Sequence, residues 1–156
     1  MGNGCTDHGR CIEEAVTRAE AACRRSGARL TPLRRRVLEL VWRGHRPVGA
    51  YEILDGLRAE GRRAAPPTVY RALEFLQGLG LVHRIASRNA WLGCPRGGPH
   101  AGGFLVCAAC GRTEEIEDRA LAAAAAASAA RHGFSAPPRA VEVVALCDGC
   151  AGTHGG

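Results

Sequence analysis

Several kinds of residue and segment are scarce in this sequence. It contains no lysine, so all 21 basic residues are arginine, and only 4% of its residues are aromatic. Hydrophobic cores must therefore consist mainly of leucine, valine, isoleucine and alanine. No stretch reaches the roughly 18 consecutive apolar residues of a membrane-spanning helix, and the alanine-rich segment 121–130 is too short. We therefore expect no contact with a membrane.

Targeting and catalytic motifs are also missing. The first eight residues lack the apolar region of a secretory signal peptide, which predicts a cytoplasmic protein. No H-E-x-x-H or comparable motif supports hydrolysis, so we predict that the protein is not an enzyme. The alternative is a metal-dependent enzyme or a thiol oxidoreductase that uses the paired cysteines described below. Stoichiometric zinc without reactive thiols would argue against redox catalysis.

The charge of the chain is unevenly distributed. Its 156 residues suffice for one ordinary domain or two small ones, and the formal net charge is +6. Residues 1–93 contain 16 arginines against 9 acidic residues, whereas residues 94–156 contain 5 against 6. The N-terminal part is therefore a candidate for binding nucleic acid. Two small domains with few aromatics would be marginally stable, so a structural metal or a dimer interface would help.

Residues 1–93 show the pattern of a winged helix-turn-helix domain. Gly27 is a plausible helix stop, and Thr31 followed by Pro32 is a strong helix start. The predicted elements are a loose tail over 1–11, helices from 12 to 27, 32 to about 44, 51 to about 61 and 66 to 78, a turn over 47–50, and strands over 81–85 and 90–92. The helix over 66–78 would enter the major groove of DNA.

Residues 94–103 are rich in glycine and proline and predict a hinge, and residues 104–156 predict a second domain. Strands are expected over 104–107, 113–116 and 140–146. Asp118 is expected to cap a helix over 119–131 that stops at Gly133.

Four of the eight cysteines form two C-x-x-C pairs. These are Cys107 with Cys110, and Cys147 with Cys150. Two such turns can complete a tetrahedral zinc site, which leaves no position for water and is therefore structural. The alternative is two redox-active or incidental thiol pairs. The 36 residues between the pairs are too many for a minimal zinc ribbon and fit a strand, a helix and another strand.

A second metal site is suggested by the ligand types left between the wing and this cluster. They are His83, Cys94, His100 and an acid, either Glu114 or Glu115. Adjacent strand residues point to opposite faces, so we expect only one of the two glutamates to bind. The alternative is that these are scattered polar residues near a hinge.

Four motifs together resemble the ferric uptake regulator (Fur) superfamily. They are R-L-T-P-L-R at 29–34, P-P-T-V-Y-R-A-L at 66–73, G-L-V-H-R at 80–84 and C-A-A-C-G at 107–111. The resemblance covers roughly residues 11–150. It implies an α+β fold with an N-terminal winged helix-turn-helix and a small C-terminal α/β dimerisation domain. A homodimer bound to a palindromic double-stranded DNA operator is also implied.

Within the superfamily, the chain is most similar to the zinc uptake regulator branch. The H-H-x-H cluster of the iron, peroxide and manganese regulators is replaced by a single histidine, His100. The resemblance implies two zinc ions per chain. The structural ion would be held by Cys107, Cys110, Cys147 and Cys150, and the regulatory ion by His83, Cys94, His100 and Glu115. We therefore expect a zinc-responsive repressor of zinc-uptake genes; the alternative is a regulator that senses iron, manganese or peroxide.

The residues expected to contact DNA are Tyr51, Thr68, Tyr70 and Arg71. Tyr51 and Arg71 resemble the base-contacting pair of the family, whereas without the resemblance Tyr51 would be taken for a core aromatic. The run Arg34–Arg36 is either a solvated face or a set of phosphate contacts.

Overall fold

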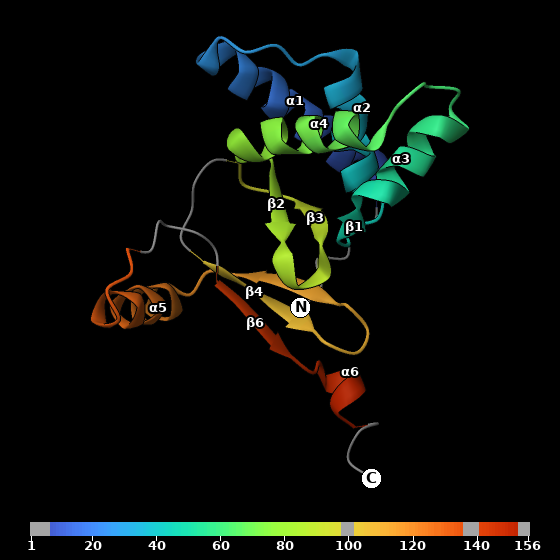
Figure 1. Ribbon diagram of the computed structural model, residues 1–156. Helices are drawn as coiled ribbons and strands as arrows, with labels where there is room; N and C mark the ends of the chain where they lie inside the picture. The colour runs from blue at the N-terminus through green and yellow to red at the C-terminus, as the bar shows by residue number, and fades with distance from the viewer. Residues whose placement is uncertain (1–6, 98–101, 136–140, 153–156) are drawn as a thin grey trace. The chain divides into compact units, whose positions relative to one another are not determined.

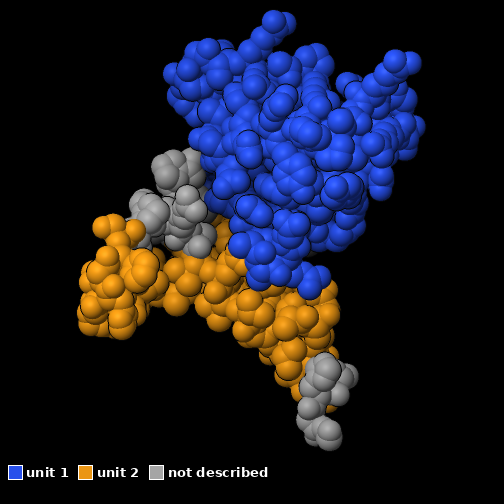
Figure 2. Space-filling view, in the orientation of Figure 1, with its two compact units in different colours: residues 1–98 blue, residues 99–156 orange. Residues whose placement is uncertain are grey.

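The computed structural model describes residues 7–97, 102–135 and 141–152. The chain divides into two compact units, which Figure 2 colours separately: unit 1, Met1–Gly98, and unit 2, Pro99–Gly156. Within the described ranges, every helix is too short or too polar to cross a lipid bilayer.

The first helix of unit 1, α1 (His8–Ser26), begins earlier than the sequence predicts. The carboxylate of Asp7 accepts a hydrogen bond from the backbone N–H of Arg10 at 3.2 Å, which caps the helix. Residues 8–11 are therefore helical, and their assignment to a loose tail was wrong. The predicted stop is confirmed, because Gly27 adopts the left-handed conformation that ends the helix, with φ 67°.

Three further α-helices follow in the described part of unit 1. They are α2 (Pro32–Trp42), α3 (Ala50–Ala59) and α4 (Pro66–Gly78). As predicted, the Thr31 hydroxyl caps α2 by accepting a hydrogen bond from the backbone N–H of Arg34 at 3.3 Å. The helices lie together on one side of a small sheet (Figure 1).

That sheet has three antiparallel strands in the order β1-β3-β2. β2 (Val82–Ile85) and β3 (Ala90–Gly93) form the predicted hairpin, and a short 3-10 helix, Ala86–Arg88, joins them. The turn predicted over 47–50 was wrong, because Val48 and Gly49 form β1 and pair with Trp91 and Ala90. Buried Val48 anchors this short strand.

The core of unit 1 is mainly aliphatic, as the scarcity of aromatics predicts. Both tryptophans of the chain, Trp42 and Trp91, are nevertheless buried in it. Residues with 1% or less of their surface exposed come from every helix and from β2; they include Ala19, Val37, Leu38, Ile53, Leu54, Leu57, Val69, Leu73, Leu76 and Val82.

Gly93 is tightly packed and gives a testable prediction for this core. A Cβ atom there would lie 2.4 Å from Cε2 of the buried Trp42 ring, so Gly93→Ala must displace the indole. We expect a loss of about 1–3 kcal/mol in the free energy of unfolding, as for other overpacked cores. Urea unfolding followed by tryptophan fluorescence measures it, because both tryptophans lie in unit 1. Gly78→Ala is the control, since nothing lies within 4 Å of its added Cβ; equal midpoints for the two variants would contradict the prediction.

The described part of unit 2 is a three-stranded sheet with two helices. Its elements are β4 (Gly103–Cys107), β5 (Thr113–Ile116), α5 (Arg119–Arg131), β6 (Val141–Ala145) and α6 (Asp148–Ala151). The Asp118 carboxylate caps α5, as predicted. β4 lies in the centre, antiparallel to β5 and parallel to β6. The four-residue helix α6 was not predicted. α5 lies near one end of the strands and α6 at the other (Figure 1).

The core of unit 2 is thin. Over residues 102–135 and 141–152, its buried hydrophobic side chains are those of Phe104, Val106 and Cys107. The helix α5 contributes no buried residue. So few buried side chains do not stabilise a sheet of this size, and a metal or a second subunit has to supply the rest.

Candidate metal centre and nucleic-acid interface

The two C-x-x-C turns lie at the same end of the sheet in unit 2. Cys107 ends β4 and Cys110 follows it in a turn, whereas Cys147 follows β6 and Cys150 lies in α6. The parallel pairing of β4 and β6 sets Cys107 opposite Ala145 and so carries the second turn to the first. All four Sγ atoms lie within 4.8 Å of one another. The structure thus brings the four predicted sulfur ligands together.

The spacing of the sulfur atoms suits a tetrahedral zinc ion. The Sγ atoms of Cys110 and Cys147 are 3.7 Å apart. A tetrahedron with zinc–sulfur bonds of about 2.3 Å has sulfur atoms about 3.8 Å apart. Four thiolates and no oxygen donor constitute a closed, structural type of site.

The electrostatics of the cluster favour binding of a cation. Backbone N–H groups of Cys110 and then Cys147 donate hydrogen bonds to the sulfur of Cys107 and lower the pKa of its thiol to about 5; the Cys147 bond is 3.4 Å long. In contrast, hydrogen bonds with the thiols of Cys147 and then Cys110 raise the pKa of Cys150 to about 12. Four thiolates cannot ionise together at this spacing unless a cation offsets their repulsion. Zn²⁺ would leave a net charge of −2 shared by the four sulfurs.

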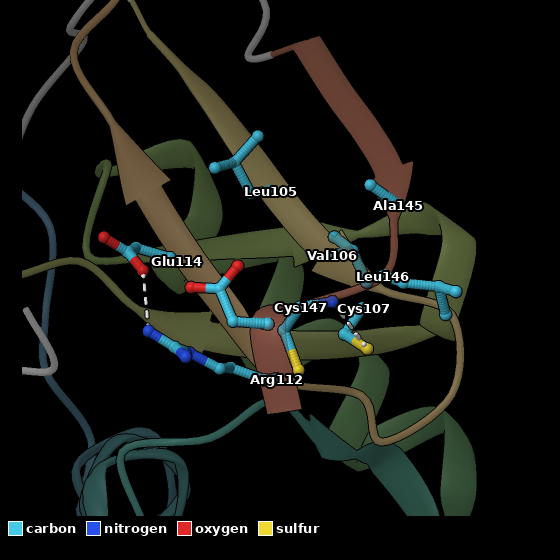
Figure 3. Close-up of a pocket in the computed structure, with 9 residues that line it drawn as sticks. Leu105, Val106, Cys107, Arg112, Glu114, Ala145, Leu146 and Cys147 are labelled. Carbon is cyan, nitrogen blue, oxygen red and sulfur yellow. Dashed lines mark hydrogen bonds and ion pairs between the residues drawn. The ribbon is translucent and has the colours of Figure 1, made fainter. Parts of the chain in front are cut away.

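Arg112 and Glu114 line a cavity of about 200 Å³ beside this cluster in unit 2. Figure 3 shows the Arg112 guanidinium directed at the carboxylate of Glu114, and the ion pair between them is 3.2 Å long. Glu114 shares a face with Leu105, its partner in the neighbouring strand, whereas Glu115 shares the opposite face with Phe104. The ion pair engages Glu114, which favours Glu115 as the acid of the second predicted site.

The other residues predicted for the second site are divided along the chain. His83 lies on β2 opposite Leu92, and Cys94 follows β3 with its backbone N–H bonded to the carbonyl oxygen of Leu81 at 2.9 Å. This register places His83 and Cys94 on the same face of the sheet in unit 1. Cys94 is 1% exposed, and its Sγ accepts a hydrogen bond from the N–H of Gly97 at 3.3 Å. Glu115 belongs to unit 2, and His100 lies outside the described residues.

The residues predicted to contact DNA have different environments in unit 1. Arg71 is exposed and Thr68 is half-buried, one turn apart on α4. Tyr51, at the start of α3, is 65% exposed, so it is not a core aromatic. Tyr70 is half-buried, and its ring packs edge-on against Trp91 with centroids 5.6 Å apart.

The run Arg34–Arg36 lies at the surface of unit 1, with Arg35 exposed and its two neighbours half-buried, which fits the interpretation as a solvated face. Arg34 lies over the Phe75 ring, 3.5 Å from its centroid. Arg35 pairs with Glu20 and Glu39, each at 3.2 Å, and Arg36 pairs with Glu39 and Glu60. These contacts connect α2 with α1, with the residue that follows α3, and with α4. The basic residues between α3 and α4 were not singled out from the sequence, although G-R-R before P-P signals them.

The fold and the cysteine cluster define a winged-helix protein with a C-terminal metal centre, and comparisons with known proteins identify the family. The model of the ferric uptake regulator family matches residues 25–144. The zinc uptake regulation protein of Escherichia coli K12 is 34% identical over 143 residues, which cover 88% of this chain and 82% of that protein. This chain therefore belongs to the ferric uptake regulator family.

Solved structures that are similar to this chain include the following two. A crystal structure of holo XcZur has a TM-score of 0.74 and 42% identity, and the match covers 88% of this chain and 96% of the other. A zinc uptake regulator complexed with zinc and DNA has a TM-score of 0.80 and 33% identity, and the match covers 91% and 96%.

Proposed function

We propose that this protein is a homodimeric, zinc-responsive repressor that binds the operators of zinc-uptake genes. The observation that carries the proposal is the pairing of a closed four-sulfur site in unit 2 with a separate histidine and thiol on the wing of unit 1. One site would stabilise the fold and the other would sense the metal. Relatives described as zinc uptake regulators, one of them bound to zinc and DNA, support the same function.

The sensing site of this proposal joins the two units. His83 and Cys94 of unit 1, His100, and Glu115 of unit 2 would hold a second zinc ion, giving two per chain. One thiolate and one carboxylate neutralise Zn²⁺, so this ion should exchange more easily than the one held by four thiolates. The thiolate favours zinc over manganese or ferrous iron. Binding would restrict the hinge, so that less ordering remains when DNA binds and zinc raises operator affinity.

The DNA-binding surface of this proposal is the N-terminal part of α4 together with Tyr51. Thr68 and Arg71 project from the first turns of the helix expected in the major groove, and Tyr70 is anchored beside them by Trp91. An exposed arginine such as Arg71 is suited to a bidentate contact with guanine. The high exposure of Tyr51 fits a residue that contacts a partner.

Unit 2 supplies the dimer interface in this proposal. Its sheet leaves Leu105 exposed at 41% on one face and Val144 at 55% on the opposite face, and Leu146, directly after β6, is exposed at 43%. A second subunit that covered such surface would add the core that unit 2 lacks alone. A two-fold dimer carries two α4 helices, which implies a palindromic operator with half-sites about one helical turn, or a multiple, apart.

An operator titration at buffered metal concentrations tests the proposed function. The operator would first be selected from random-sequence duplexes with zinc-loaded protein. We expect affinity to rise with free zinc and to rise far less with iron or manganese. A rise with iron or manganese alone, or release of DNA by peroxide, would support the alternative sensor of the same fold. Metal-independent binding would contradict both.

A further inference from the structure

A hollow with a basic rim lies in unit 1 between the end of α3 and the start of α4. It encloses about 600 Å³ of open space, and its polar lining consists of Arg58, Arg62, Arg63 and Thr68. Gly61, Ala64 and Ala65 form the rest of its wall. We call these seven residues the basic hollow. The small side chains of the alanines leave the arginine side chains room to turn toward a ligand.

The arginines of the basic hollow are poorly neutralised by the protein itself. Glu60 is the acid that Arg62 approaches, but Arg36 donates hydrogen bonds to both of its carboxylate oxygens, at 2.9 and 2.8 Å. Arg62 reaches Glu60 only at 3.7 Å. Over the described ranges, Arg58 and Arg63 have no carboxylate within ion-pair distance. The positive charge of the basic hollow therefore remains available to an anion.

The start of α4 explains why arginine side chains, rather than the helix itself, would hold that anion. A helix usually offers free backbone N–H groups at its first turn. Here the first two positions are Pro66 and Pro67, which have no N–H. The next two N–H groups, of Thr68 and Val69, already donate to the carbonyl oxygen of Ala65, at 3.0 and 3.4 Å. The guanidinium groups and the Thr68 hydroxyl are the donors left.

Thr68 also links the basic hollow to the surface proposed to read DNA. It lines the hollow and lies one turn before Arg71 on α4. A helix in the major groove has the sugar-phosphate backbone at its N-terminal edge, and arginine forks match phosphate geometry. We propose that the basic hollow binds a backbone phosphate of DNA through Arg58 and Arg63, with the Thr68 hydroxyl as a further donor. This inference rests on the proposed function and deepens it.

The salt dependence of DNA binding tests this inference. Affinities of Arg63→Ala and Arg58→Ala would be measured for the selected operator and for a random duplex, each over a range of salt concentrations. Each variant should bind both duplexes more weakly by the same factor. The slope of log affinity against log salt should fall in magnitude by about 1, because one phosphate contact is lost. Arg63→Lys keeps the charge and should keep most of the slope.

Three controls make the outcome decisive. Arg131→Ala removes an exposed arginine of α5 in unit 2 and should leave the slope unchanged. Arg71→Ala should instead lower the preference for operator over random DNA by about tenfold. Unfolding by tryptophan fluorescence shows whether unit 1 of each variant is intact. The inference would be overturned if both Arg58→Ala and Arg63→Ala kept the wild-type salt slope, or if they lost affinity for the operator alone. The proposed function would still stand if the wild type showed zinc-dependent binding. A wild type that binds neither duplex would overturn the proposed function and this inference with it.

Discussion

Replacing Cys150 by serine is expected to unfold unit 2 and to release the zinc ion that we propose its four cysteines hold. Serine is a poor zinc ligand, and the affinity of a structural site for its metal is also folding free energy. The described part of unit 2 has three buried hydrophobic side chains, so little else would hold its sheet together. Cys107→Ser should have the same effect, since the two residues belong to one cluster.

The two units allow this effect to be localised. Bound zinc counted by elemental analysis, far-ultraviolet circular dichroism and sedimentation should report the loss of metal, of sheet and of dimer. Tryptophan fluorescence should stay unchanged, because Trp42 and Trp91 both lie in unit 1. Cys11→Ser is the matched control, since it removes a thiol of α1 that belongs to neither predicted site. A Cys150→Ser protein that remained folded and dimeric without that zinc would refute the assignment.

Cys94→Ser is expected to separate zinc sensing from folding. The variant should remain folded, keep one tightly held zinc per chain, and bind the operator weakly at any physiological zinc level. The loss should equal the coupling between zinc and DNA, typically about 1–3 kcal/mol or roughly 5- to 150-fold in affinity. Cys94 is the most informative of the proposed ligands because its thiolate supplies both negative charge and the preference for zinc.

The measurement is operator affinity across buffered zinc, with bound metal counted at each point. Because Cys94 is buried, unfolding by tryptophan fluorescence must show that unit 1 is intact. His83→Gln is the second variant, because this substitution removes a ligand of the same proposed site at a residue that is only half-buried. If both variants kept a normal zinc-dependent rise in affinity, the sensor would lie elsewhere. Cys5, Cys11, Cys23 and His132 would then be the next residues to test.

The parts of the fold that the sequence predicts are those set by neighbouring residues. Thr31 and Asp118 cap their helices, and Gly27 ends α1, because each acts on backbone groups a few positions away. The start of α1 was missed because Asp7 caps it from within a polar, glycine-rich segment. β1 was missed because its two residues form a strand only through pairing with β3, far along the chain.

The same distinction separates the predictable and unpredictable parts of the sites. C-x-x-C spacing is local, so the four cysteines could be singled out before their strands were placed. The role of Arg35 and Arg36 could not be predicted, because their partners are distant in the sequence. Glu20 is 15 positions from Arg35, and Glu60 is 24 positions from Arg36. Periodicity alone would also have buried Tyr51, which the fold leaves exposed.

The parallel pairing of β6 with β4 also sets the order in which the protein can assemble as it is synthesised. Cys110 and Cys147 are 37 positions apart, so the first thiol pair leaves the ribosome well before the second. When the first pair leaves the ribosome, all of unit 1 has already been made. The contacts between successive helices of unit 1 form quickly. Closing the long loop to β6 is slower. During that interval a folded unit 1 carries an open pair of thiols, which oxidants and competing metal ions can reach before the second pair arrives.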